Sequence, residues 1–366
     1  MATNKMKMGP LLHINKDINC LRNLVLAGTN YFVIIDNNLQ HLSSFFEDFP
    51  QICLTACEQG KTLETVEKIA ETLLELGADR DAFIIGVGGG ITTDIAGFTA
   101  SIYKRGVKFA FVPTTLLSQT DASIGGKNGV NFHAFKNMLG TITQPEWIFI
   151  CPQLLETLPQ EDFKAGIAEV LKTFILFDKE MYRTSVGYFS SVAKEYAQRD
   201  DMQNTYGKIA VNQDMDLLCR IIGKCAEYKC GVVERDEFEK GERRMLNLGH
   251  TFAHAIEKLS EGKISHGYAV SIGMVIAARI AGYMGVAQEG FAESLARDLR
   301  MAGLPSSLEE CPATAHLKVA DLTDAIKKDK KVTGNSLHFI LPKGLEDVED
   351  IVIPIETLKK ICNDLR

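Results

Sequence analysis

A run of glycines with charged residues close behind it is the first part of the sequence that could do chemistry. The apolar run Ala82–Ile85 leads into GVGGG at 86–90, and a helix-compatible segment follows from Ile91, with Asp94 one turn further on. A strand, a glycine turn and a helix in this order bring bare backbone N–H groups up to a phosphate at the positive end of the helix. Glycines after a strand can also serve only as a tight turn, so both interpretations stand for this segment alone.

Charged and amide side chains are dense in the segment that follows. They lie among glycines and short apolar runs, in a stretch that otherwise reads as buried: Arg105, Asp121, Lys127, Lys136 and Asn137. Burying a charge is costly unless it has a partner or a ligand. This density therefore indicates a lined pocket and not a solvated face.

A predicted helix over Gln160–Phe177 carries two opposite charges in a largely apolar sequence. Glu169 and Lys172 are three residues apart, which places them on one face of the helix. An ordinary surface ion pair would explain these two charges.

A second predicted helix, over Arg243–Leu259, carries an unusual polar stripe. Spacings of four, three and four align its members: Arg243, Asn247, His250 and His254. Histidines at i and i+4 can share one metal ion, and His266 follows after a short loop. The motif is HTFAH and not HExxH, so the glutamate base of a zinc protease is missing. Two histidines satisfied by local hydrogen bonds remain the alternative.

The bulk properties of the chain exclude several classes of protein. At 366 residues it is too long for one ordinary core, which favours two domains. Its composition (46% apolar, 24% charged) is typical of a soluble globular protein, and a formal charge of -7 argues against nucleic-acid binding. Nine scattered cysteines without CxxC spacing indicate reduced thiols. No secretory signal begins the sequence, and the apolar stretch Tyr268–Ala278 is short enough to be a buried helix.

The elements that must position these residues change in character along the chain. Residues 1–157 alternate strand-like and helix-like segments: Tyr31–Ile35, Thr62–Leu76 (helical), Ala82–Ile85, Val107–Val112 and Trp147–Ile150. Such alternation predicts parallel strands, with ligands at their carboxyl ends. Asp36 lies at such an end and could bind a ribose or cap a helix. Helical periodicity dominates from Leu158 to about Gly285, so we predict an α/β domain over 1–157 and a mostly α-helical domain over 158–366.

Six motifs in order resemble the 3-dehydroquinate synthase family of sugar-phosphate cyclases. They are GVGGGITTDIAGFTASIYKRG, VPTTLLSQTDASIGGKNGVN, KNMLGT, AGIAEVLK, LNLGHTFAHAIE and SHGYAVSIGM. The resemblance runs from about Gly86 to Gly285. It implies a Rossmann-like NAD-binding α/β domain, a mostly α-helical metal-binding domain and an active site between them.

The resemblance also implies a metal site that differs from the one suggested by spacing. It gives one divalent ion, zinc most often and cobalt as an alternative, held by Glu169, His250 and His266. His254 is then left near the substrate. Three protein ligands with open positions are typical of a catalytic zinc.

The family pattern assigns further residues to the cofactor and the substrate. For NAD+ it indicates Asp36, Glu58, Lys61, Gly88, Gly89, Gly90, Asp94, Thr114, Thr115, Lys127 and Lys136. For the substrate it indicates Arg105, Asp121, Lys127, Lys136, Asn137, Lys172, Lys229, Arg243, Asn247, His254 and Lys330. Catalytic roles fall to Lys127, Asn137, Lys172, Lys229, Arg243, Asn247 and His254. The sequence departs from the family pattern at Phe135, at Glu161–Asp162 and at Thr92–Thr93.

The implied reaction converts 3-deoxy-D-arabino-heptulosonate 7-phosphate to 3-dehydroquinate and phosphate. It proceeds by transient oxidation with NAD+, phosphate elimination, re-reduction and aldol closure. The resemblance further implies a homodimer in the shikimate pathway that acts on a phosphorylated sugar acid. Charge, cysteine content and hydropathy predict a cytoplasmic protein that binds neither nucleic acid nor membrane. The alternatives are another sugar-phosphate cyclase, a metal-dependent glycerol or alcohol dehydrogenase, and a non-catalytic regulator that binds metal or nucleotide.

Overall fold

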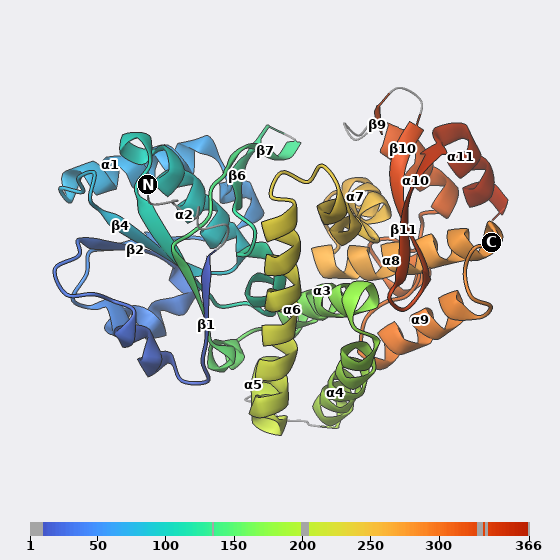
Figure 1. Ribbon diagram of the computed structural model, residues 1–366, viewed down its shortest axis with the longest axis horizontal. Helices are drawn as coiled ribbons and strands as arrows, with labels where there is room; N and C mark the ends of the chain where they lie inside the picture. Colours follow the sequence, from blue (N-terminus) through green and yellow to red (C-terminus); the bar gives the residue numbers. More distant parts are fainter. Residues whose placement is uncertain (1–9, 134, 199–204, 328–331, 334–335, 365–366) are drawn as a thin grey trace, which may run out of the picture. The chain divides into compact units, whose positions relative to one another are not determined.

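The computed structural model describes residues 10–133, 135–198, 205–327, 332–333 and 336–364 (Figure 1). Contacts divide the chain into two compact units. The α/β unit comprises Met1–Leu158 and Asp214–Phe238, and the helical unit comprises Pro159–Gln213 and Glu239–Arg366. Helix α6 (Met215–Arg235) belongs to the α/β unit because it packs on β1 and on the short helices η5 and η6 of that unit. The division therefore differs from a single cut at 157/158.

A six-stranded parallel sheet forms the centre of the α/β unit. Its strands are β1 (Leu11–Ile14), β2 (Tyr31–Asp36), β3 (Gln51–Leu54), β4 (Phe83–Gly88), β5 (Lys108–Pro113) and β8 (Trp147–Ile150). The order is β1-β8-β5-β4-β2-β3, and every neighbouring pair is parallel. The four predicted strands and the parallel α/β architecture are confirmed. The two edge strands, β1 and β3, were not predicted.

Helical segments flank the sheet. They are η1 (Ile18–Asn23), η2 (Asn37–Phe46), η3 (Glu58–Gly60), α1 (Leu63–Glu75), α2 (Gly90–Ile102), η4 (Tyr103–Arg105), η5 (Ser118–Ala122) and η6 (Pro152–Leu155). The helix predicted over Thr62–Leu76 is confirmed, with the side chain of Thr62 as its N-cap. Both faces of the sheet are buried, which is why its strands read as continuous apolar runs.

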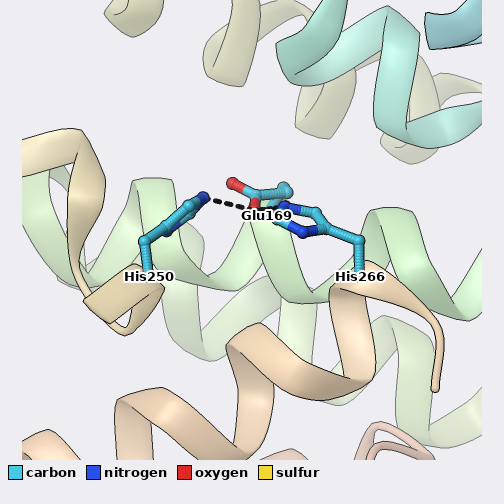
Figure 2. Close-up of side chains that lie close together, drawn as sticks. All are labelled: Glu169, His250 and His266. Atoms are coloured by element: carbon cyan, nitrogen blue, oxygen red, sulfur yellow. Dashed lines mark ion pairs between the residues drawn. The ribbon is translucent and has the colours of Figure 1, made fainter. Parts of the chain in front are cut away.

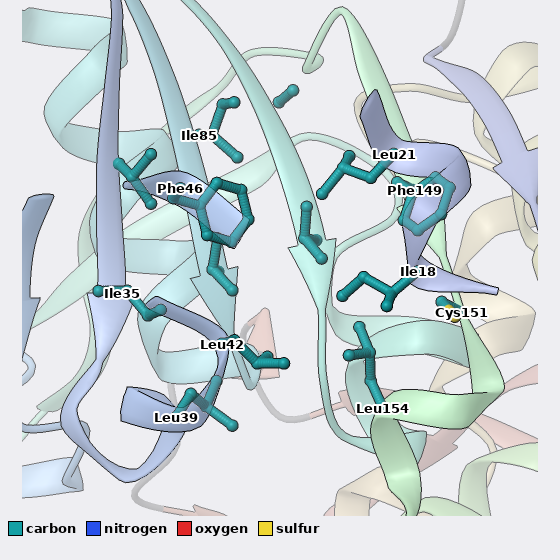
Figure 3. Close-up of a cluster of buried hydrophobic side chains, with 14 of the residues drawn as sticks. Ile18, Leu21, Ile35, Leu39, Leu42, Phe46, Ile85, Phe149, Cys151 and Leu154 are labelled. Atoms are coloured by element: carbon teal, nitrogen blue, oxygen red, sulfur yellow. The ribbon is translucent and has the colours of Figure 1, made fainter. Parts of the chain in front are cut away.

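One face of the sheet packs against η1 and η2 in a continuous apolar cluster (Figure 3). Residues two apart along the strands point to this face, and the cluster includes Ile35, Ile85 and Phe149 from the strands and Leu21, Leu42 and Phe46 from the two short helices. On the opposite face Gly86 allows α2 to approach, since a Cβ on Gly86 would lie 2.8 Å from the Cβ of Ala96. This close packing fixes the start of α2 at the end of β4.

An antiparallel hairpin that the sequence did not predict carries several of the expected site residues. It consists of β6 (Lys127–Phe132) and β7 (Phe135–Ile142). Gly129 and Gly140 face each other across it, and a Cβ on Gly140 would lie 2.4 Å from the carbonyl oxygen of Asn128. Glycine is required there because the two backbones are in contact.

The second unit is mostly helical, as predicted. Its helices are α3 (Gln160–Phe177), α4 (Lys179–Ala197), α5 (Tyr206–Gln213), η7 (Glu242–Asn247), α7 (His250–Leu259), α8 (His266–Tyr283), α9 (Phe291–Met301), η8 (Leu308–Glu310), α10 (Val319–Lys327) and α11 (Ile355–Asp364). A small antiparallel sheet, not predicted, joins β9 (Val332–Thr333), β10 (Ser336–Gly344) and β11 (Asp347–Pro354). Of the helices that the structure describes, none combines the length and the apolar character that crossing a membrane requires.

The predicted helix over 243–259 is wrong in one important respect, because the chain breaks before His250. Segment η7 ends at Asn247, Leu248 is extended, and Gly249 takes a left-handed conformation with φ 79°. A Cβ on Gly249 would also lie 2.9 Å from the backbone nitrogen of Met274. Both the φ value and the close approach require glycine. The predicted four-residue stripe is therefore divided between two elements, η7 and α7.

Candidate active site

Three side chains from separate helices of the helical unit meet in what we call the Glu169 group: Glu169, His250 and His266 (Figure 2). Their nearest ligand atoms all lie within 4.8 Å of one another. The Nε2 atoms of His250 and His266 lie 3.6 and 3.4 Å from Oε1 of Glu169. Each histidine is the first residue of its helix, α7 or α8, and Glu169 lies in the middle of α3.

Glycines allow these three helices to touch through their backbones. A Cβ on Gly267, next to His266, would lie 2.2 Å from the carbonyl oxygen of Ala165, one turn before Glu169. A Cβ on Gly273 would lie 2.2 Å from the carbonyl oxygen of Gly249. The spacing of the three ligand-bearing helices is therefore fixed by backbone contacts that only glycine permits.

Glu169 and Lys172 form a buried ion pair. Their side chains are 1% and 2% exposed, and the Lys172 ammonium contacts Oε2 of Glu169. The interpretation as a surface ion pair is therefore wrong. Burial alone would raise the pKa of Glu169, but the Lys172 ammonium and the two imidazoles outweigh it and hold this pKa well below its usual range. The carboxylate is ionised and directs its other oxygen, Oε1, at the histidines.

The two imidazoles are both held through Nδ1. Nδ1 of His250 lies 3.2 Å from the carbonyl oxygen of Leu248, and Nδ1 of His266 lies 3.5 Å from Oε1 of Glu257. Burial and the Lys172 ammonium lower the pKa of His250 well below its usual range. Burial also acts to lower the pKa of His266, but the carboxylates of Glu169 and Glu257 on either side of the ring outweigh it and raise this pKa to about 10.

The donor set fits a divalent metal ion. Both carboxylate oxygens of Glu169 are buried, and neither accepts a hydrogen bond from a residue that the structure describes. Zinc bonds to nitrogen and oxygen of about 2.1 Å in a tetrahedron place ligand atoms about 3.4 Å apart. The distances of 3.6 and 3.4 Å from Oε1 of Glu169 to the two Nε2 atoms match that separation. One carboxylate and two imidazoles leave open positions, as in a catalytic site.

His254 is not a member of the group. Its ring lies on α7 with its centroid 5.7 Å from that of His250, at an interplanar angle of 86°. Among the described residues, the ligand atoms that cluster are those of Glu169, His250 and His266. The arrangement agrees with the family resemblance and not with the spacing of the two histidines in HTFAH.

A second polar assembly, the Lys61 cluster, lies in the α/β unit and consists of Glu58, Lys61, Asp94, Asn131 and Asn137. The Lys61 ammonium contacts the carboxylate of Asp94 and donates to Oδ1 of Asn137 at 2.5 Å. Lys61 is 5% exposed, so this ammonium is buried, whereas the Asp94 side chain is 19% exposed and Asn137 lies at an exposed position. Burial raises the pKa of Asp94 to about 6, and Lys61 acts against that rise.

Asn131 connects the other members of this cluster, and the sequence reasoning missed it. Its side-chain amide donates to Oε1 of Glu58 at 2.8 Å, and its Oδ1 accepts from the backbone of Asn137 at 2.8 Å. Its own backbone N–H donates to the carbonyl oxygen of Lys61 at 2.8 Å. Asn137 has φ 49°, so its backbone needs such support. The available signal was an asparagine inside the strand-like run GVNF.

The glycine turn joins the end of a parallel strand to the start of a helix. Gly88 ends β4, Gly89 precedes α2, and Gly90 is the first residue of α2. A Cβ on Gly88 would lie 2.5 Å from Oγ1 of Thr92, and the carbonyl oxygen of Gly88 accepts from the N–H of Thr114 at 3.0 Å. The N-terminus of a thirteen-residue helix thus follows directly on a parallel strand.

The other residues expected in the α/β unit have varied positions. Lys229 donates to Oδ1 and to the carbonyl oxygen of Asp121, both at 2.7 Å, and so joins α6 to η5. Asp36 caps η2 by accepting from the N–H of Asn38 at 3.0 Å, which is one of its two predicted roles. Thr115 bonds to Ser118. Exposed positions hold Arg105, Lys127 and Lys136.

Two further residues expected at the site, Arg243 and Asn247, lie on η7 of the helical unit. Arg243 is 3% exposed, and the amide of Asn247 donates to Oε1 of Glu239 at 2.5 Å. Arg244 anchors η7 to β11 through a 2.9 Å contact with Asp350. Lys330 lies outside the described residues. Glu239 and Glu257 were not predicted from the sequence, because acidic residues near a helix end usually signal only a solvated surface.

Two solved structures share this fold. One is a 2-epi-5-epi-valiolone synthase from Streptomyces hygroscopicus subsp. jinggangensis 5008 with NAD+ and Zn2+ bound (TM-score 0.80, 24% identity, 100% of this chain and 99% of that one). The other is a 2-deoxy-scyllo-inosose synthase complexed with carbaglucose-6-phosphate, NAD+ and Co2+ (TM-score 0.79, 24% identity, 96% of each chain). At this identity the likeness shows the fold alone.

Sequence comparison defines the family. Residues 51–165 match the model of the 3-dehydroquinate synthase N-terminal domain, and residues 166–332 match the C-terminal domain of the same enzyme. A 3-dehydroquinate synthase from Sulfurisphaera tokodaii is 40% identical over 320 residues, covering 87% of this chain and 84% of that protein. The chain belongs to the 3-dehydroquinate synthase family.

Proposed function

We propose that the chain converts 3-deoxy-D-arabino-heptulosonate 7-phosphate to 3-dehydroquinate and phosphate. This is a carbon–oxygen lyase reaction of the shikimate pathway, which supplies chorismate and the aromatic amino acids, and we place it in the cytoplasm. Membership of the family supports the proposal. The observation that carries it is the buried Glu169 carboxylate, which faces two imidazoles and accepts no hydrogen bond from the described residues.

Two bound groups would supply chemistry that no side chain provides. NAD+ supplies a temporary hydride acceptor, and a divalent ion, zinc or cobalt, at the Glu169 group supplies polarisation of the sugar oxygens. The two synthases of similar fold contain NAD+ with Zn2+ or Co2+. Oε1 of Glu169 and Nε2 of each histidine would hold the metal ion.

Residues of the α/β unit would bind the nucleotide and part of the substrate. The glycine turn lets backbone N–H groups approach the pyrophosphate at the N-terminus of α2. The Lys61 cluster fixes the loop at Glu58 and the hairpin residue Asn137, and Asp36, Thr114 and Thr115 lie at or just beyond the ends of parallel strands. Lys127 and Lys136, at exposed positions of the hairpin, would bind phosphate oxygens.

The substrate is an anion with a carboxylate and a phosphate, and several cations of this acidic chain suit it. They are Arg105, Lys127, Lys136, Lys172, Lys229, Arg243 and Lys330. Lys172 stands beside the metal ligand Glu169, where it favours an anion and keeps the carboxylate ionised. Asn247 and His254 would orient hydroxyl groups or move protons, and Asp121 would position Lys229. Much of the acceleration would come from orientation of the sugar.

The test is phosphate release from the heptulosonate phosphate with NAD+, in the presence of zinc or of a chelator. We expect release with zinc, none with chelator, and no net accumulation of NADH. Turnover of sedoheptulose 7-phosphate or glucose 6-phosphate in its place would indicate another cyclase. Steady NADH formation from glycerol or an alcohol would indicate a dehydrogenase. Gel filtration with light scattering tests the homodimer that we also propose.

A further inference from the structure

Glu257 is a buried carboxylate that the proposed reaction does not use. Its side chain is 8% exposed, and its Oε1 lies 3.5 Å from Nδ1 of His266. Burying an acid in this way is costly unless it serves a partner. We propose that Glu257 is a positioning residue that orients His266 for binding of the metal ion. The inference rests on the metal site proposed above.

The imidazole of His266 lies between two carboxylates. Nδ1 faces Glu257 at 3.5 Å, and Nε2 faces Oε1 of Glu169 at 3.4 Å. When Nδ1–H is donated to Glu257, the lone pair of Nε2 points to the side where Glu169 lies. A carboxylate behind a ligating histidine fixes the tautomer, limits rotation of the ring and makes the ligand nitrogen more basic.

Helix α7 supplies both a ligand and the support for another ligand. His250 is the first residue of α7, and Glu257 follows seven residues later, so both lie on one face about two turns apart. His266 begins α8 after a short turn, and Ser265 caps that helix by accepting from the N–H of Tyr268. The position of Glu257 is thus set by the same helix that places His250.

The two histidines are supported in equivalent ways by different groups. Nδ1 of His250 lies 3.2 Å from the carbonyl oxygen of Leu248, a backbone group that no substitution removes. Nδ1 of His266 has a side chain in the corresponding place. Glu257 is therefore the support that mutation can test.

A purely structural role for Glu257 predicts a different result from a role toward the metal. If the carboxylate only stabilises the packing of α7 against α8, its loss weakens the metal-free protein and leaves zinc affinity unchanged. If it orients His266, its loss weakens zinc binding, by about 10- to 100-fold for partners of this kind.

The experiment measures the zinc dissociation constant of the full chain by competition with a chromophoric chelator. We compare the wild type with Glu257→Gln and Glu257→Ala, and use Glu261→Gln as the control, since Glu261 is exposed and pairs with Lys263. We expect affinity in the order wild type, Gln variant, Ala variant, with a total loss of about 10- to 100-fold. The control should bind zinc as the wild type does. Urea unfolding in excess chelator measures the metal-free proteins separately.

The outcomes separate this inference from the proposed function. If the wild type and both variants bind zinc within twofold of one another, Glu257 has no role toward the metal. If the Ala variant does not fold, the Gln variant decides, because it keeps the shape of the side chain and loses only the charge. If the wild type itself binds no zinc, the metal-dependent function and the role of Glu257 both fail.

Discussion

The Lys61 cluster and the Glu169 group are two polar assemblies, each built around one buried charge, that differ in how far their polar atoms are hydrogen-bonded. In the Lys61 cluster the ammonium contacts a carboxylate and an amide oxygen, and Asn131 joins Glu58 to Asn137. In the Glu169 group both carboxylate oxygens are buried without a hydrogen bond from the described residues, although Lys172 contacts one of them. The first assembly is completed by its own chain, whereas the second would be completed by a bound cation.

The way each assembly is built follows from this difference. The members of the Lys61 cluster come from a short helix, a hairpin and the first turns of α2, and they hold one another by hydrogen bonds. The members of the Glu169 group come from three helices whose spacing is set by Gly249, Gly267 and Gly273. Three helices in fixed contact can hold the side-chain oxygen and nitrogen atoms close together without hydrogen bonds between them. We expect the first assembly to tolerate loss of a ligand and the second to depend on one.

The largest effect should come from removing a metal ligand. We expect His250→Ala to lose bound zinc and to reduce phosphate release to background, because two ligands hold zinc poorly. His254→Ala should keep its zinc and lose rate, since His254 is outside the group. Atomic absorption after dialysis measures the metal, and a phosphate assay measures the rate.

Lys127→Ala serves as the control for the α/β unit, because Lys127 is placed in the substrate set and not at the metal. It should lose phosphate release and keep zinc. A His250 variant with full zinc content, or a His254 variant without zinc, would mean that the ligands are assigned wrongly.

The next largest effect should come from the glycine contacts of the helical unit. Gly267→Ala would place a Cβ 2.2 Å from the backbone oxygen of Ala165, and a backbone atom cannot move aside as a side chain can. We expect a loss of about 4 kcal/mol or more in the free energy of unfolding, at or beyond the usual range for overpacking, together with weaker zinc binding. Urea unfolding in the presence of a chelator measures the free energy of unfolding.

Gly282→Ala is the matched control on the same helix. A Cβ at Gly282 would meet no atom within 4 Å, and alanine has a higher helix propensity than glycine. This variant should be as stable as the wild type or more so. Equal stability of the Gly267 and Gly282 variants would mean that α3 and α8 can separate without cost.

Local patterns were enough to predict the central parallel strands of the α/β unit and the helix after the glycine turn. The apolar runs at Tyr31–Ile35, Val107–Val112 and Trp147–Ile150 are strands, and the glycine turn after β4 does open a helix. A helix predicted over Gln160–Phe177 has those same bounds in the structure. These features depend on residues near one another in sequence, which is where periodicity is informative.

The metal group could not be predicted by spacing, because its members come from three helices. The spacing of HTFAH suggested a pair in which His254 took part, and only the family resemblance indicated Glu169 and His266. The break at Gly249 was missed because a single glycine within a helical pattern does not reveal its φ. The pairing of β6 with β7 and the role of Asn131 were missed for a related reason. Contacts between different backbone segments produce no periodic pattern in the sequence.

A smaller effect is expected from breaking the Lys61 cluster at Asn131. Asn131→Ala removes its bonds to Glu58 and to the backbone of Asn137, which we expect to cost about 3 kcal/mol in the free energy of unfolding. It should also raise the KM for NAD+ more than it lowers kcat, because the residues it positions are assigned to the cofactor. Asn19→Ala is the control, since Asn19 is exposed and bonds only locally to Asp17 among the contacts described. If the variant has the same KM for NAD+ as the wild type, Asn131 does not contribute to cofactor binding.

The smallest effect concerns pH and tests how completely Lys61 compensates the burial of Asp94. Burial raises the pKa of Asp94 to about 6 from an ordinary value of 3.8. A carboxyl whose pKa is raised by folding stabilises the folded protein when protonated, and that contribution is lost as pH rises through about 4 to 6. Between pH 4 and 7 the stability of the wild type relative to Asp94→Asn should therefore fall by about 2 kcal/mol. That is less than the full shift, since water reaches 19% of the side chain. Urea unfolding at a series of pH values gives the free energy of unfolding of the wild type and of Asp94→Asn as a function of pH. If the two curves are parallel, Lys61 offsets the burial of Asp94 in full.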